Sequence, residues 1–268
     1  DLAAHSSFEE TASLLLHGEL PNAAGLTAFD DQLKQGRQLP GEVYDIIRAV
    51  SSAHPMDVLR TAVSALAAFD GETADCSPEA TLRKGVRLTS QVPMIVAAHH
   101  RMRNGHEPVD ADPDLSHAAN FLYMISGEVP SEDAARLMDL DFILHAEHGS
   151  NASSFTARVV TGTDANLHAA ITAAIAALSG PAHGGAAENV MHMAREIGDP
   201  ANARDYVKAK RKNREAIMGF GHRVYRAEDP RAKHLRSGVE RLSVEKGEPH
   251  WNEILKALVE AMAPYSRH

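Results

Sequence analysis

The stretch SEDAARLMDLDFILHAEH, residues 131–148, carries the pattern that decides the fold class. Ser131 suits the position before a helix, because its hydroxyl can accept a hydrogen bond from a backbone amide of the first turn. The side chains behind it that approximate a stripe at helical spacing are Ala134, Leu137, Met138, Leu144 and His148. We therefore expect a helix with one buried face over this stretch.

Similar start signals recur along the chain. Ser7 and Glu10 have the spacing of a capping box, in which each side chain accepts a hydrogen bond from the other residue's backbone amide. Ser77 followed by a proline opens a long segment that runs toward Arg103. Pro93 lies inside that segment and is expected to kink or break it, because proline lacks the amide that a helix interior needs.

Further helices are expected in the second half of the chain. Asp164 is expected to open the alanine-rich segment DANLHAAITAAIAALSG, and the following proline ends it. The remaining helices are expected at about 185–197, 202–218, 230–245 and 251–262. Alternating apolar and polar residues, the mark of half-buried strands, are nearly absent. The sequence therefore predicts an all-α fold.

Composition narrows the class of protein. The 268 residues are 44% hydrophobic and 24% charged, which is typical of a globular protein with a sizeable core. No apolar run has the roughly 20 residues of a membrane span, so we expect no membrane partner. The formal charge of -9 argues against nucleic-acid binding, and the single cysteine favours a reducing, cytoplasmic compartment.

The chain is expected to form two domains, 1–180 and 181–268. The helices before the boundary are apolar and rich in alanine, whereas those after it are shorter and more charged. The boundary coincides with the segment GPAHGG, whose glycines and proline disfavour regular structure. Such a segment can hold functional side chains or act as a hinge.

The segment LHAEHGSN places His145 and His148 one turn apart at the end of a helix. Two histidines at this spacing can bind a metal, but the pattern H-E-x-x-H of zinc proteases is absent. With one cysteine in the chain, too few ligands are identifiable for a closed zinc site, and no metal is expected. Taken alone, either histidine is better explained as a buried or helix-capping residue; the alternative gives His148 a hydrogen bond to a substrate oxygen.

The segment GPAHGG places His183 between a proline and two glycines. A helix starting near Gly185 would point its amide ends back toward the imidazole and favour its neutral form, which can donate one hydrogen bond. The alternative is an ordinary turn between helices in which the histidine is incidental. The residues alone leave these two interpretations about even.

The segment IMGFGHRVYRAEDPRAKHLR, residues 217–236, concentrates five basic side chains in an acidic protein. Gly219 is expected just after a helix ending at Met218, and His222 would stand on the following loop with Arg226 and Arg231 beyond it. Arginine binds carboxylates and phosphates through two parallel hydrogen bonds, which favours a local anion site. The alternative is a capped helix end followed by a solvated charged face.

Several of these segments together resemble the citrate synthase family. The stretch GFGHRVYRAEDPR resembles the family's signature, and the other matching segments, in the family's order, are FEETASLLLHGELP, HPMDVLRTAVSAL, DLSHAANFLYM, ILHAEHGSNASSFTARVV and GPAHGGAAENVM. The resemblance implies an almost entirely helical homodimer, with a large domain that forms the dimer and a smaller domain that closes over the substrates. It also implies condensation of acetyl-CoA with oxaloacetate, acetyl-CoA being a co-substrate, with no other cofactor.

The resemblance also implies roles for particular residues. His183 matches the histidine that hydrogen-bonds the thioester oxygen as the enol forms, and His222 matches the one that protonates the ketone. The residues implied for oxaloacetate are His148, Arg231 and Asn151. Those implied for CoA are Arg226, which matches a phosphate ligand, and Met218, Gly219, Phe220 and Gly221 near the adenine.

One departure from the family's pattern qualifies this expectation, and three alternative functions stay open. The family's base is an aspartate that would follow shortly after the last residues given, MAPYSRH, so we assign this role to no residue here. We expect the 268-residue chain alone to be inactive, and we expect the parent protein to be longer. The nearest alternative is 2-methylcitrate synthase, which uses propionyl-CoA, because one methylene changes binding by only about 1–3 kcal/mol. A non-catalytic module that binds CoA or a dicarboxylate is a second alternative, and a helical metalloprotein a distant third.

Overall fold

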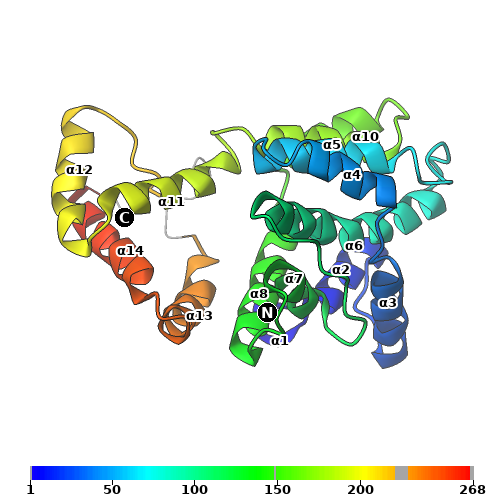
Figure 1. The fold of residues 1–268 in the computed structure, drawn as a ribbon, viewed down its shortest axis with the longest axis horizontal. Helices are drawn as coiled ribbons and strands as arrows, with labels where there is room; N and C mark the ends of the chain where they lie inside the picture. The colour runs from blue at the N-terminus through cyan, green and yellow to red at the C-terminus, as the bar shows by residue number, and fades with distance from the viewer. Residues whose placement is uncertain (1, 148, 221–228, 266–268) are drawn as a thin grey trace. The chain divides into compact units, whose positions relative to one another are not determined.

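The structure is a computed structural model that describes residues 2–147, 149–220 and 229–265. Across these residues the regular elements are helices, with no strand, which confirms the expected all-α fold. The chain divides into two compact units, residues 1–179 and 180–268 (Figure 1). The helices of unit 1 are α1 (Leu2–His5), α2 (Phe8–His17), α3 (Ala23–Gln35), α4 (Gly41–Ala49), α5 (Pro55–Leu66), α6 (Pro78–Arg103), α7 (His117–Ser126), α8 (Glu132–Ala146), α9 (Ala152–Thr161) and α10 (Leu167–Leu178).

Unit 2 is built around one central helix. Its elements are α11 (Gly185–Ile197), the 3-10 turn η1 (Pro200–Asn202), α12 (Ala203–Lys212), α13 (Ala232–Glu245), α14 (Pro249–Met262) and the 3-10 turn η2 (Ala263–Tyr265). Helix α14 contacts all the others. The buried core of this unit comprises Met193, Ala194, Ile197, Ala203, Val207, Ile217, Ile254, Leu258, Ala261 and Met262.

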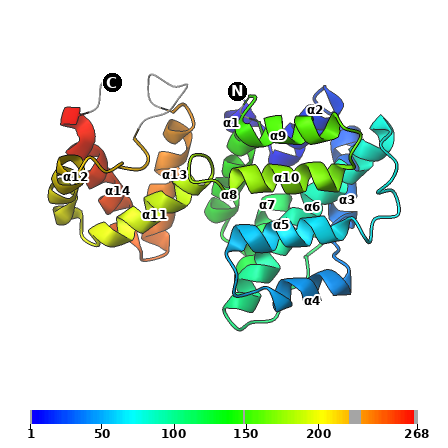
Figure 2. The same cartoon turned by 90° about the horizontal axis from the view of Figure 1, so that it is seen from above.

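Helix α6 is the axis of unit 1. It contacts α3, α4, α5, α7 and α10, and Figures 1 and 2 show α4, α5, α10 and α9 side by side on one side of it. Pro93 was expected to kink or break this segment; the break is wrong, because α6 continues through Pro93 as one element. A proline inside a helix costs about 3 kcal/mol. Burial of Leu88, Ile95 and Ala98 on either side of Pro93 in the main core offsets that cost.

The three serine caps predicted from the sequence are present at the starts of their helices. Ser7 and Glu10 form the capping box, and the hydroxyls of Ser77 and Ser131 each accept a hydrogen bond from the amide three residues on. The start of α10 differs, because the carbonyl oxygen of the Asn166 side chain caps the amide of Ala169 at 3.0 Å. Asp164 does not open this helix.

The helix expected over 202–218 ends six residues early, at Lys212. Arg214 has a φ of 59°, in the left-handed region, which stops the helix. The turn is held by the amide of Glu215, which donates to the carbonyl of Lys210 at 2.9 Å, and by the Lys210 ammonium, which donates to the Glu215 carboxylate at 2.8 Å. Local side-chain contacts therefore outweigh the helical pattern here.

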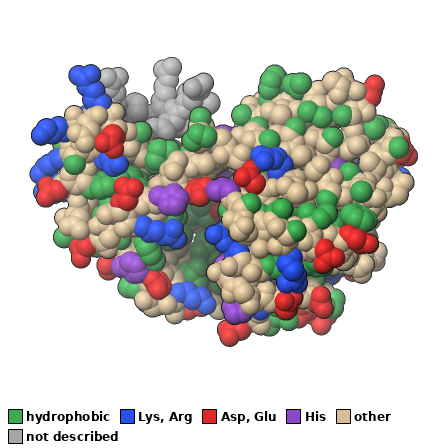
Figure 3. All heavy atoms as spheres, turned by 45° about the horizontal axis from the view of Figure 1, so that its top comes forward, with side chains coloured by type: hydrophobic (Ala, Val, Ile, Leu, Met, Phe, Trp, Pro, Cys, Tyr) green, Lys and Arg blue, Asp and Glu red, His purple; other side chains and the backbone are tan. Residues whose placement is uncertain are grey.

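Helices α9 and α10 leave apolar side chains on the surface of unit 1. Phe155 and Val159 are 61% and 54% exposed, one turn apart on α9, and Leu178 at the end of α10 is also exposed. Figure 3 turns this side of unit 1 toward the viewer and shows hydrophobic side chains among acidic ones on its right. Of the helices whose residues the structure describes, none combines the length and apolar character needed to cross a membrane.

Candidate active site

His183 lies in the turn that joins the two units' chain segments and leads into α11. Its amide donates to the carbonyl of Gly180 at 2.9 Å, and its own carbonyl accepts from the amide of Ala186 at 3.1 Å. Gly184, the residue before α11, makes no side-chain cap. The amides of Gly185 and Ala187 donate to the carbonyls of Gly180 and Gly184 at 3.2 and 3.1 Å, so backbone groups of the turn close the start of α11. His183 itself is half-buried, two residues before the helix begins.

Arg231 lies at the start of α13 and is held by Asp229. Its Nε donates to Asp229 Oδ1 at 3.0 Å and its Nη2 donates to Oδ2 at 2.7 Å. The Arg231 backbone amide donates to the same Oδ1 at 2.9 Å. Both side chains are half-buried. Sequence reasoning chose Arg231 but missed Asp229, although an acidic residue two positions before an arginine at a helix start is a readable signal.

The segment from Met218 to Phe220 packs on the core of unit 2. Both end side chains contact its buried cluster. Gly219 has a φ of 84°, a backbone conformation that favours glycine. The expectation that Gly219 caps a helix ending at Met218 is wrong, since α12 ends at Lys212. A methyl group added at Gly219 would meet Val190 Cγ2 at 3.5 Å, an ordinary contact, so the backbone angle is what calls for glycine.

Asn151 belongs to unit 1, where it caps α9. Its Oδ1 accepts hydrogen bonds from the amides of Ser153 and Ser154 at 2.9 and 3.1 Å. That oxygen is therefore engaged in capping α9. The His145 side chain contacts its own helix, α8, where its Nδ1 lies 2.8 Å from the backbone carbonyl oxygen of Asp141.

Four predicted site residues lie outside the described residues: His148, Gly221, His222 and Arg226. The structure brings His183, Arg231 and the Met218–Phe220 segment into unit 2, where α11 and α13 both pack on α14. Asn151 lies in unit 1. The part of the chain that the structure describes contains no cluster of three or more histidine, cysteine or acidic side chains arranged to hold a metal ion.

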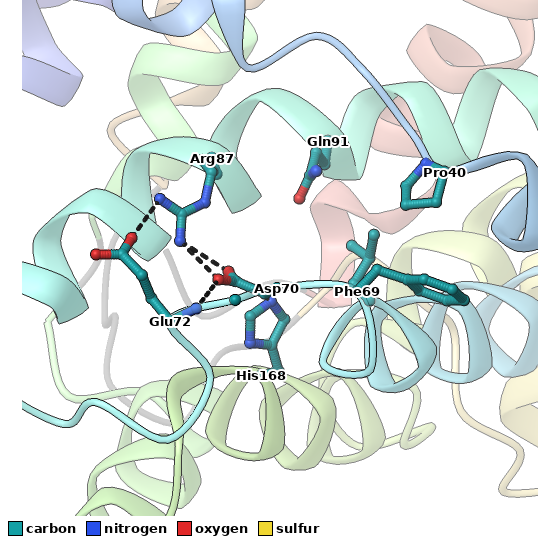
Figure 4. Close-up of a pocket in the computed structure, with 9 residues that line it drawn as sticks. Pro40, Phe69, Asp70, Glu72, Arg87, Gln91 and His168 are labelled. Carbon is teal, nitrogen blue, oxygen red and sulfur yellow. Dashed lines mark hydrogen bonds and ion pairs between the residues drawn. The ribbon is translucent and has the colours of Figure 1, made fainter.

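Unit 1 contains a hollow of about 280 Å³ that the sequence did not indicate (Figure 4). Arg87 projects from α6, donates to both oxygens of Asp70 at 2.9 and 2.8 Å, and donates to Glu72 at 2.8 Å. His168 of α10 lies beneath, with Nε2 3.6 Å from the Asp70 carboxylate. Burial raises the pKa of Asp70, but its hydrogen bonds and the charge of Arg87 lower it overall. With the Arg87 charge matched by two carboxylates, this hollow does not suit an anionic substrate.

Comparison with known proteins identifies relatives over the whole chain. The family described as "Citrate synthase, C-terminal domain" matches residues 1–268. The chain is 46% identical over 256 residues to Citrate synthase 2 of Bacillus subtilis, covering 95% of this chain and 69% of that protein. It is 43% identical over 264 residues to the 2-methylcitrate synthase of Mycobacterium tuberculosis H37Rv, covering 98% of this chain and 67% of that protein.

Solved structures that are similar to this chain belong to proteins with the same name as several of these relatives, citrate synthase. The chain is similar to the citrate synthase of Pyrobaculum aerophilum, with a TM-score of 0.90 and 38% identity, over 98% of this chain and 68% of that one. It is also similar to a citrate synthase of Thermoplasma acidophilum solved in ternary complex with carboxymethyl coenzyme A and oxaloacetate. There the TM-score is 0.91 and the identity 29%, over 99% of this chain and 71% of that one.

Proposed function

The chain belongs to the citrate synthase family, and we propose that it condenses acetyl-CoA with oxaloacetate and hydrolyses citryl-CoA to citrate and CoA. The observation that carries this proposal is the 46% identity to a citrate synthase over 95% of the chain. Its further support is that His183, two residues before α11, and Arg231, at the start of α13, both belong to unit 2.

In this proposal two imidazoles handle the oxygen atoms that change charge. A base removes a methyl proton from the thioester, and His183 donates a hydrogen bond to the thioester oxygen as the enol forms. The enol carbon attacks the ketone carbon of oxaloacetate, and His222 protonates the ketone oxygen. Placed donors of this kind are worth roughly 2.7–4 kcal/mol each, because they lie where negative charge develops. We assign the base to no aspartate among these residues.

The remaining predicted residues bind the two anionic substrates. Arg231, His148 and Asn151 hold oxaloacetate, whose carboxylates match the two-point geometry of a guanidinium. For CoA, Arg226 binds a phosphate, and the backbone of Met218, Gly219, Phe220 and Gly221 lies near the adenine. No further cofactor is proposed.

The experiment is a thiol-release assay on the protein as its gene encodes it. We expect CoA release that requires both acetyl-CoA and oxaloacetate. A protein that binds oxaloacetate by calorimetry but releases no CoA from any thioester would instead be the non-catalytic binding module, and the proposal would be wrong.

A second candidate, 2-methylcitrate synthase, is favoured by the 43% identity to an enzyme of that name. Both reactions use the same groups, and the two thioesters differ by one methylene, worth about 1–3 kcal/mol. The ratio of kcat/KM for acetyl-CoA to that for propionyl-CoA decides between them. We expect a ratio above one.

We also propose a homodimer that covers the apolar face of α9 and α10. Phe155, Val159 and Leu178 are exposed on these two neighbouring helices, and burying such a face removes apolar surface from water. Light scattering should give twice the chain mass for the wild type and less for the double variant Phe155→Asp, Val159→Asp. Val129→Asp, at an exposed valine before α8, is the matched control. A monomeric wild type would contradict the proposal.

A cytoplasmic location completes the proposal. Its support is the single cysteine, Cys76, which is exposed and unpaired and thus suits a reducing compartment. Cell fractionation with an antibody to the protein would test it, and recovery in a secreted or membrane fraction would contradict it.

A further inference from the structure

The contact between Asp229 and Arg231 joins two residues separated by one proline. The Asp229 carboxylate accepts a hydrogen bond from the Arg231 backbone amide at 2.9 Å. It also accepts from the guanidinium, whose Nε lies 3.0 and 3.2 Å from the two carboxylate oxygens and whose Nη2 lies 2.7 Å from Oδ2. Pro230 fixes its own φ, which limits how far the two residues can turn apart. The carboxylate therefore holds the guanidinium at two points and the chain at a third.

This arrangement fixes one edge of the guanidinium. A guanidinium offers a side edge, Nε with one Nη, and an end edge formed by both Nη atoms. Asp229 occupies the side edge through Nε and Nη2. A second carboxylate would be bound through the end edge, in the plane that Asp229 has already set. An arginine side chain otherwise samples many rotamers, and ordering it on binding weakens affinity.

A capping role explains the pair less well. The α13 helix has no side-chain cap on its first amides. The Asp229 side chain accepts from the amide of Arg231, and the amide of Ala232 is satisfied instead by the Asp229 backbone carbonyl at 3.0 Å. Of the four hydrogen bonds between the Asp229 carboxylate and Arg231, one comes from the backbone amide and three come from the guanidinium. The carboxylate thus orients Arg231 more than it starts the helix.

We propose that Asp229 is a positioning residue that holds the guanidinium of Arg231 ready for a carboxylate of oxaloacetate. This inference rests on the proposed function, in which Arg231 binds that substrate. It adds a residue that touches neither substrate but sets the affinity for one of them. The acyl-CoA affinity should not depend on it.

The test is Asp229→Asn in the protein as its gene encodes it. Asparagine keeps an oxygen for the Arg231 amide and nearly the same shape, but loses the charge and the second acceptor oxygen. Immobilising a side chain of this kind is worth a binding factor of roughly three to ten. We expect KM and calorimetric Kd for oxaloacetate to rise by that factor, with kcat and the KM for acetyl-CoA within about twofold.

Three further variants test whether the effect comes from the contact between Asp229 and Arg231. Asp229→Glu keeps the charge and should fall between the wild type and the asparagine variant. Arg231→Lys cannot make the two-point contact, so Asp229→Asn added to it should raise KM no further. Asp205→Asn breaks an exposed pair with Lys208 in the same unit and should change nothing.

Each outcome decides the inference. An unchanged oxaloacetate KM, an equal rise for both substrates, or a tighter oxaloacetate KM, as expected if Asp229 competes with substrate, would overturn it. Thiol release by the wild type decides the proposed function separately. A wild type that turns over while Asp229→Asn leaves its oxaloacetate KM unchanged therefore refutes this inference alone.

Discussion

A buried histidine makes stability depend on pH in a way that can be calculated. His117, at the start of α7, is 4% exposed and stacks on Phe8 with ring centres 4.7 Å apart. Its backbone amide donates to the carboxylate of Glu9 at 2.8 Å, which ties α7 to α2. The pKa of His117 is lowered from 6.5 to about 4, mainly by burial and to a smaller extent by the positive charge of Arg37, while the charge of Asp30 opposes both.

The direction in which pH changes the free energy of unfolding depends on whether the folded or the unfolded state binds the proton of His117. Between pH 6.5 and about 4 the unfolded chain protonates this imidazole and the folded protein does not. Stability is therefore complete above pH 6.5 and falls as the pH decreases through that window. At about 1.36 kcal/mol per pH unit the full loss is about 3 kcal/mol, of which about 2.5 kcal/mol has occurred by pH 4.5. Burial raises the pKa of nearby Asp139, which gives an opposite slope at the acid end.

The assay compares His117→Gln with the wild type by urea unfolding at pH 7.5 and pH 4.5. Glutamine cannot titrate, so the variant should lose about 2.5 kcal/mol less than the wild type between these two pH values. Asp139 acts in both proteins and cancels from the difference. His106→Gln, at an exposed histidine, should behave as the wild type. If the free energy of unfolding changes equally with pH in the wild type and in His117→Gln, the lowered pKa of His117 does not cause the loss of stability.

Three other substitutions test the packing and the turns. Ile254→Ala, at a fully buried side chain in the core of unit 2, should lower the free energy of unfolding by about 2–5 kcal/mol in urea, while exposed Val244→Ala should change it by less than about 0.5 kcal/mol. Gly219→Ala should cost about 1–2 kcal/mol because of the left-handed backbone, whereas Gly41→Ala should cost less, and a rise in the KM for acetyl-CoA should accompany the first. Ser77→Ala should cost about 1 kcal/mol in thermal unfolding through loss of the α6 cap, and an unchanged Tm would contradict that cap.

Local features of the fold could be predicted because they depend on residues a few positions apart. The caps at Ser7, Ser77 and Ser131 agree with the structure for this reason. Pro93 did not break its helix, because core burial on both sides, invisible to a local pattern, outweighs the local cost. The early end of α12 depends on Arg214, whose backbone lies in the left-handed region. A pattern of apolar residues at helical spacing does not reveal that conformation.

Contacts between residues far apart in the chain could not be predicted from the sequence. Glu9 and His117 are 108 positions apart, and no pattern pairs them. The hollow around Arg87 likewise joins three elements that a single sequence cannot bring together. At the candidate site the resemblance implied residue roles, whereas the contact between Asp229 and Arg231 is seen only in the structure.

In the proposed function, His183 stabilises the charge that forms on the thioester oxygen. The most direct test of this role is the turnover of His183→Ala at saturating acetyl-CoA and oxaloacetate, with His192→Ala on α11 as the exposed control. We expect kcat to fall about a hundred- to a thousandfold while the oxaloacetate Kd stays within about twofold. A kcat within twofold of the wild type would contradict it.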